Sequence, residues 1–133
     1  MAACTPVGLE TYVQLSATRL GLQREWLSFL RDYPLVLAPV FTESPPEPGL
    51  ESRGPAAHAR VAAAMRMCSV TSLLGLPAVA VPTSVAEGLP LGIQLIGAPY
   101  REDMCLEAAE AIEQRRGTFT PVDPLHEFHN SGR

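Results

Sequence analysis

The cysteines and histidines of this chain, three of each, carry the side chains best suited to nucleophilic or metal chemistry. A thiol becomes a strong nucleophile when a neighbouring imidazole takes its proton, so Cys68 or Cys105 paired with His58 is one candidate site. Cysteines at apolar helical positions are more often small core residues, however. The sequence therefore favours packing over catalysis for both thiols.

The other two histidines lie near the end of the sequence. His126 and His129 are three residues apart, which does not match the His-Glu-x-x-His spacing of a zinc-binding helix. We expect both to lie in a flexible tail, residues 125–133. The cysteines lack a Cys-x-x-Cys spacing, and no Gly-x-Gly spacing is present for a phosphate-binding loop. The sequence therefore predicts no metal site and no cofactor.

Composition is typical of a globular protein of one domain. The 133 residues are 47% hydrophobic and 18% charged, with a net charge of −4. Nucleic-acid binding is disfavoured because neutralising phosphates requires clustered cations. No apolar run approaches the ~20 residues of a membrane span, and no signal peptide is visible. The odd cysteine count suits a reducing compartment, so we expect a cytoplasmic protein that binds neither nucleic acid nor membrane.

The hydrophobic pattern of the first half predicts a helix, a strand, a loop and a second helix. Apolar positions including Val13 and Leu20 form one stripe over residues 9–31, where Gly21 allows a kink. The apolar run 35–38 predicts a strand that is covered on both faces. A proline-rich loop follows at 39–55, and a helix over 56–74 ends before Gly75.

The second half predicts a hairpin and a last helix. Strands 78–81 and 91–96 are joined through residues 84–88, where Gly88 can adopt a positive φ. Residues 102–116 form a helix with acids in its first turn and arginines in its last, which suits the helix dipole. The fold class is α/β, with a few strands of a mixed sheet and an antiparallel hairpin flanked by about three helices. So few strands, apolar on both faces, indicate part of a larger fold.

Four ordered segments resemble the C-terminal region of amidase-signature hydrolases. They are residues 32–39 (DYPLVLAP), 75–82 (GLPAVAVP), 88–97 (GLPLGIQLIG) and 102–107 (EDMCLE). The similarity covers roughly residues 10 to 124 and implies a partial amidase-signature fold. It implies that residues 1–124 are the C-terminal part of a domain that hydrolyses carbon–nitrogen bonds other than peptide bonds. The glycines and prolines of these segments shape the sheet and identify the family without carrying its chemistry.

The resemblance also implies a mechanism whose parts this chain lacks. Family members use a serine nucleophile, a second serine and a lysine base, because a serine hydroxyl alone is a weak nucleophile. The sequence contains no lysine, no adjacent serines and no adjacent glycines for the family's glycine-serine loop. Arginine cannot serve as the neutral base because its pKa is too high. We therefore predict no catalytic residue here and expect the chain to be inactive alone.

The resemblance still implies a contribution to a substrate pocket. Met67, Cys68 and Thr71 correspond to the helix that lines the acyl pocket, and Phe41 and Thr42 follow the first strand at its mouth. An ordinary core role for Met67 and Cys68 stays open. The leading hypothesis is a C-terminal amidase fragment without the Ser-Ser-Lys core, from a truncated gene or a split enzyme. The alternatives are a non-catalytic module that joins a separate N-terminal half or itself, and a self-standing protein with a new role.

Overall fold

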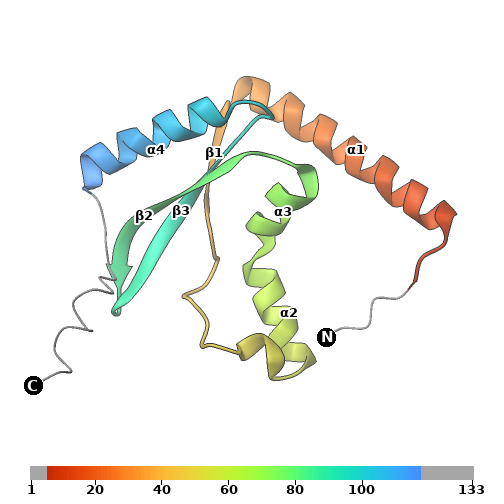
Figure 1. Ribbon diagram of the computed structural model, residues 1–133, viewed down its shortest axis with the longest axis horizontal. Helices are drawn as coiled ribbons and strands as arrows, with labels where there is room; N and C mark the ends of the chain where they lie inside the picture. The colour runs from red at the N-terminus through yellow and green to blue at the C-terminus, as the bar shows by residue number, and fades with distance from the viewer. Residues whose placement is uncertain (1–5, 118–133) are drawn as a thin grey trace, which may run out of the picture.

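The structure, a computed structural model, describes residues 6–117 and arranges four α-helices around a three-stranded sheet (Figure 1). The α/β class predicted from the sequence is thereby confirmed. Among the described residues, no helix is long and apolar enough to cross a membrane.

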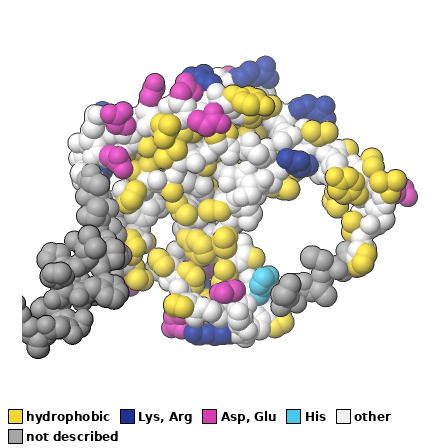
Figure 2. Space-filling model, in the orientation of Figure 1, with side chains coloured by type: hydrophobic (Ala, Val, Ile, Leu, Met, Phe, Trp, Pro, Cys, Tyr) yellow, Lys and Arg dark blue, Asp and Glu magenta, His cyan; other side chains and the backbone are white. Residues whose placement is uncertain are grey.

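Helix α1, Leu9–Asp32, runs without a break through Gly21. A single glycine costs a helix interior only about 1 kcal/mol, which the other residues can absorb. The predicted apolar stripe is present but largely uncovered, since Val13 and Leu20 are 57% and 55% exposed while Leu30 is 4% exposed. Apolar side chains are accordingly visible on the surface of the free end of α1 (Figure 2).

The sheet has the order β1-β3-β2, and all its described pairs are antiparallel. Its strands are β1 Leu35–Pro39, β2 Ala78–Ala86 and β3 Leu89–Gly97. The hairpin strands are longer than predicted because the turn needs only Glu87 and Gly88, whose φ values are 53° and 77°. Two consecutive positive φ values match the twist of a two-residue hairpin. The positive φ predicted for Gly88 is confirmed.

The second predicted helix is two helices, α2 Pro55–Ala64 and α3 Arg66–Leu74, after a short 3-10 turn at Leu50–Ser52. Met65 separates them with φ −85° and ψ 7°. The predicted stop at Gly75 is confirmed, because this residue adopts the left-handed conformation at φ 65° that favours glycine. The last helix, α4 Glu102–Arg116, has the predicted bounds.

Two apolar clusters hold these elements together, one on each face of the sheet. On one face α1 and α3 meet β1 and β3 around Ile96, which is fully buried. On the other face α4 packs over β2 and β3. The first cluster contains Leu30, Ala38, Leu74, Leu76 and Ile96; the second contains Val81, Leu95 and Ala109.

The expectation that β1 is covered on both faces is wrong for the described chain. Ala38 is buried against α1 and α3, but Leu37, on the opposite face, is 62% exposed. The physical reason is that β1 lies at the edge of the sheet while α4 lies over the other two strands.

Candidate functional site

The chain leaving β1 is held by side chains from two other elements. The carbonyl oxygen of Pro39 accepts a hydrogen bond from Nε2 of Gln94, at 3.0 Å. Gln94 lies on β3 and is 4% exposed, so burial leaves its amide dependent on such protein partners. The carbonyl oxygen of Val40 accepts from Sγ of Cys68 on α3, at 3.2 Å. The backbone is thus fixed where the strand ends.

Thr42 completes this attachment. Its backbone N–H donates to the carbonyl oxygen of Ala64 at 3.1 Å, and its Oγ1 lies 3.4 Å from the same oxygen. Ala64 ends α2 and is 3% exposed. Phe41 therefore lies between anchored residues. We call these contacts the β1-exit clamp: Gln94 to Pro39, Cys68 to Val40, and Thr42 to Ala64.

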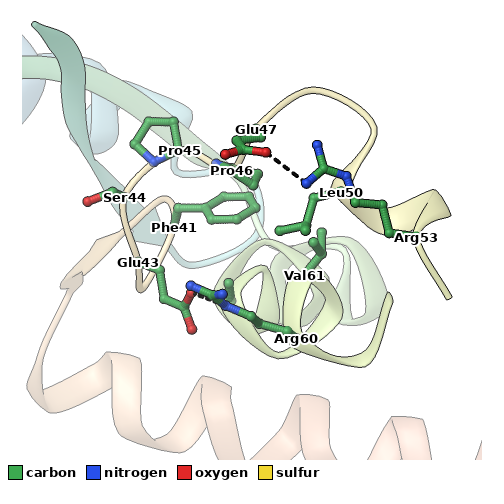
Figure 3. A pocket seen from close by; sticks show the side chains of 11 residues that line it. Phe41, Glu43, Ser44, Pro45, Pro46, Glu47, Leu50, Arg53, Arg60 and Val61 are labelled. Carbon is green, nitrogen blue, oxygen red and sulfur yellow. Dashed lines mark hydrogen bonds and ion pairs between the residues drawn. The ribbon is translucent and has the colours of Figure 1, made fainter. Parts of the chain in front are cut away.

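Phe41 lines an open hollow of about 580 Å³ between the proline-rich loop and α2 (Figure 3). This volume lies within the roughly 300–1,000 Å³ of small-molecule sites. Two ion pairs, Glu43–Arg60 and Glu47–Arg53, stand beside it, each with a closest N–O distance of 2.8 Å. Their side chains are well exposed, so each pair stabilises the fold by less than about 1 kcal/mol. The remaining lining residues are Ser44, Pro45, Pro46, Leu50, Val61 and Ala64.

The five residues predicted from the sequence do not gather in this hollow. Phe41 lines it, and Thr42 acts as an anchor beside it. The other three lie half-buried on α3. Met67 packs against the cluster around Ile96, and Cys68 forms part of the clamp through its bond to Val40. Oγ1 of Thr71 donates to the carbonyl oxygen of Cys68 at 2.8 Å. The clamp nevertheless links the two groups of residues through Cys68.

Sequence reasoning did not identify the charged rim of the hollow. Glu43 and Glu47 are visible in the sequence as acids within a proline-rich loop. Their arginine partners could not be assigned, because the pairing depends on how the loop folds back over α2.

A second hollow, of about 390 Å³, lies where α1 meets β1, and sequence reasoning did not identify it either. Its lining residues are Glu25, Trp26, Phe29 and Val36. The ring of Phe29 stacks on that of Tyr33 with centroids 4.9 Å apart, and it makes a T-shaped contact with the ring of Trp26 at a centroid distance of 6.5 Å. Phe29 and Tyr33 remain 49% and 61% exposed. The spacing of Trp26 and Phe29 on α1, with Tyr33 directly after the helix, is the signal that was available.

The two described thiols do not form the candidate pair with His58. Cys105 is fully buried, and burial, followed by the negative charges of Glu102 and Asp103, raises the pKa of its thiol. Cys68 donates its hydrogen bond to a backbone carbonyl, whereas His58 is exposed on α2. Both observations favour a packing role over a nucleophilic one for these cysteines.

Metal-binding side chains are scattered over residues 6–117. In that part of the chain, no group of three or more His, Cys, Asp and Glu side chains is placed to hold a metal ion. His126, His129 and the predicted tail at 125–133 lie outside the described residues.

Comparison with known sequences gives a consistent result. Residues 7–106 match the family described as Amidase. An indoleacetamide hydrolase of Bradyrhizobium diazoefficiens is 39% identical over 119 residues, which is 89% of this chain and 23% of that protein. A glutamyl-tRNA(Gln) amidotransferase subunit from Brucella anthropi is 53% identical over 52 residues, or 38% of this chain and 10% of that one. The chain thus spans less than a quarter of the length of these two relatives.

Solved structures agree in fold. A crystal structure of an amidase superposes with a TM-score of 0.67 at 28% identity, covering 84% of this chain and 26% of that one. A structure described as a vestigial protein complex that reveals the evolutionary origins of an s-triazine catabolic enzyme gives the same TM-score and identity, and it covers 88% of this chain and 26% of that one.

Proposed function

The chain belongs to the amidase family, and on that premise we propose that it forms the C-terminal part of an amide-hydrolysing fold without hydrolysing amides itself. In this proposal the serine nucleophile and its base come from polypeptide outside these 133 residues. The chain contributes the sheet edge, the helices that pack on it and one wall of the substrate pocket.

One observation carries the proposal: a family match over residues 7–106 in a chain that contains no lysine and no adjacent serines. A serine hydroxyl needs a positioned base to attack an amide carbonyl. A lysine can act as that base only when its surroundings leave it neutral, and arginine stays charged at any ordinary pH. The ten cationic residues here are all arginines.

The proposed pocket wall consists of Met67, Cys68 and Thr71 on α3, with Phe41 and Thr42 at its mouth. The β1-exit clamp supports this assignment, since Sγ of Cys68 reaches the carbonyl oxygen of Val40 at 3.2 Å. A direct hydrogen bond therefore joins the wall to the mouth. A substitution that fills the wall, such as Thr71→Leu, is expected to change the preference for acyl size in a complete enzyme.

The test is activity of the purified chain. We expect no release of ammonia from indole-3-acetamide or acetamide above a control without protein, and no covalent adduct with a fluorophosphonate probe. The Bradyrhizobium diazoefficiens hydrolase serves as the positive control. Labelling of a serine in the isolated chain would overturn the proposal.

A second candidate is a non-catalytic module that associates with a separate N-terminal amidase half. The exposed apolar side chains of α1 and β1 favour it, because uncovered apolar surface drives association. If the chain alone is a monodisperse monomer that melts cooperatively, its exposed apolar surface no longer argues for a partner. The free thiols of Cys68 and Cys105 support a reducing, cytoplasmic setting for either candidate.

A further inference from the structure

We propose that the second hollow, where α1 meets β1, binds a small organic cation that carries a quaternary ammonium group. We call it the aromatic hollow; its lining residues are Glu25, Trp26, Phe29 and Val36, and its volume is about 390 Å³. It combines two aromatic rings with one carboxylate, and ring faces attract quaternary ammonium groups. The inference goes beyond the proposed function and does not depend on it, because binding at this hollow makes and breaks no covalent bond.

Two rings form the corner of the aromatic hollow. The planes of Trp26 and Phe29 are inclined by 71°, so that both can present a face to one bound group. Trp26 packs against the cluster around Ile96, and Tyr33 stacks on Phe29 from beyond the end of the helix. Both rings are thus held in place before a ligand arrives, which lowers the entropy that binding costs. Phe29 is still 49% exposed, so its ring is accessible from solvent.

The charges around the aromatic hollow favour a cation. Glu25 is the one ionisable residue among those that line it, and its side chain is exposed. Arg24 and Arg31 each lie two positions from a lining aromatic residue, which is roughly 160° around a helix of 3.6 residues per turn. They are therefore on the opposite side of α1. Within residues 6–117, no arginine forms an ion pair with Glu25.

The apolar character of the remaining lining favours a quaternary ammonium group over other cations. A primary ammonium or a guanidinium group needs an acceptor for each N–H that it removes from water. Trp26, Phe29 and Val36 offer no side-chain acceptor, and Glu25 alone cannot satisfy several donors. A quaternary ammonium group has no N–H to satisfy, so its methyl groups can contact the rings while its charge faces the carboxylate.

The experiment compares two ligands of equal shape. The full 133-residue chain is titrated with choline and with 3,3-dimethylbutan-1-ol, in which carbon replaces the charged nitrogen. Trp26 is the single tryptophan of the chain and lines the hollow, so its fluorescence reports binding directly. We expect saturable binding of choline and an affinity for the alcohol that is lower by about tenfold or more. Equal affinities, or no saturable change in a chain shown by circular dichroism to be folded, would overturn the proposal.

Two substitutions separate the charge from the ring. Glu25→Gln should weaken choline binding about threefold or more and leave binding of the alcohol unchanged. Phe29→Leu keeps an apolar side chain but removes a ring face, so it should also weaken choline more than the alcohol. Glu10→Gln is the matched control, because Glu10 lies in the first turn of the same helix and outside the hollow. An equal loss in Glu10→Gln and Glu25→Gln would assign the effect to net charge and overturn the site.

A last arm distinguishes the sources of the ammonium group. The chain is sedimented with phosphatidylcholine vesicles, with and without free choline. Vesicle binding that choline displaces would identify a lipid headgroup, and binding of free choline alone would identify a soluble molecule; either result supports the site. Vesicle binding that choline does not displace, in a chain that also fails to bind free choline, would overturn it. So would a dimer of the chain in which Trp26 no longer responds to choline, because a second copy would then occupy the hollow.

Discussion

Gln23 on α1 donates a hydrogen bond from Nε2 to the carbonyl oxygen of Leu74, 51 residues later, at 2.7 Å. The neighbouring Arg19 donates from Nε to the carbonyl oxygen of Leu73. The last carbonyl groups of a helix have no partner within the helix, so α1 satisfies the C-terminal end of α3. This contact joins the first helix to the helix that carries the proposed pocket wall.

The first prediction concerns this contact. Gln23→Ala leaves the Leu74 carbonyl without its side-chain donor and should lower the free energy of unfolding by about 1 kcal/mol. Urea denaturation with the midpoint as readout measures it. Gln114→Ala is the control, because Gln114 bonds only an exposed side chain on its own helix, and its midpoint should stay nearly unchanged. Equal midpoints for both variants would contradict the prediction.

The second prediction concerns the contact of Gly97 with Cys105. A Cβ added at Gly97 would lie 2.7 Å from Sγ of Cys105, which is fully buried and cannot move aside freely. Gly97→Ala should therefore destabilise the fold by roughly 1–3 kcal/mol through overpacking. The double variant with Cys105→Ala should recover much of this loss, since the clashing sulfur is gone. A double variant as unstable as the sum of the single ones would refute this steric explanation.

The third prediction concerns the hairpin turn. Glu87 has a φ of 53°, a conformation that asparagine tolerates better than glutamate. Glu87→Asn creates the Asn-Gly pair preferred in such turns and should stabilise the chain by about 0.5–1 kcal/mol. Gly88→Ala should act in the opposite direction, because Gly88 lies at φ 77°. Thermal melting tests both expectations: the melting temperature should rise in Glu87→Asn and fall in Gly88→Ala.

The fourth prediction concerns the ionisation of Cys105. Burial, helped by Glu102 and Asp103, raises the pKa of the folded thiol above its ordinary value of 9.0. The unfolded thiol loses its proton first, so the free energy of unfolding should fall as the pH rises above that ordinary value. Below it both states hold the proton, and this group adds no slope. Urea midpoints measured across this range should show the decline in the wild type and less of it in Cys105→Ala.

Much of the fold could be predicted from the sequence because local signals determine it. Gly75 and the residues flanking α4 define helix ends through capping and dipole effects that act within one turn. The break at Met65 could not be predicted, since neither glycine nor proline marks it. The exposure of Leu37 could not be predicted either, because it depends on where α4 packs, which is a tertiary property.

The candidate site was predicted less well for a similar reason. The residues named through the family resemblance lie on α3 and directly after β1, and Phe41 lines the hollow beside the loop. Whether Met67, Cys68 and Thr71 line a pocket stays a prediction, because in the proposed function the opposite wall comes from polypeptide outside these 133 residues. The ion pair of Glu43 and Arg60 at the rim could not be predicted from the sequence, because it depends on the folded path of the loop.

The β1-exit clamp has a consequence for how the loop can vary. Pro39, Val40 and Thr42 are attached to β3, α3 and α2, so the ring of Phe41 is placed before the proline-rich stretch begins. Insertions or deletions after Glu43 would then alter the outer wall of the hollow while the aromatic ring keeps its position. Changes in loop length alone could therefore alter the size and shape of this hollow during evolution, without disturbing β1.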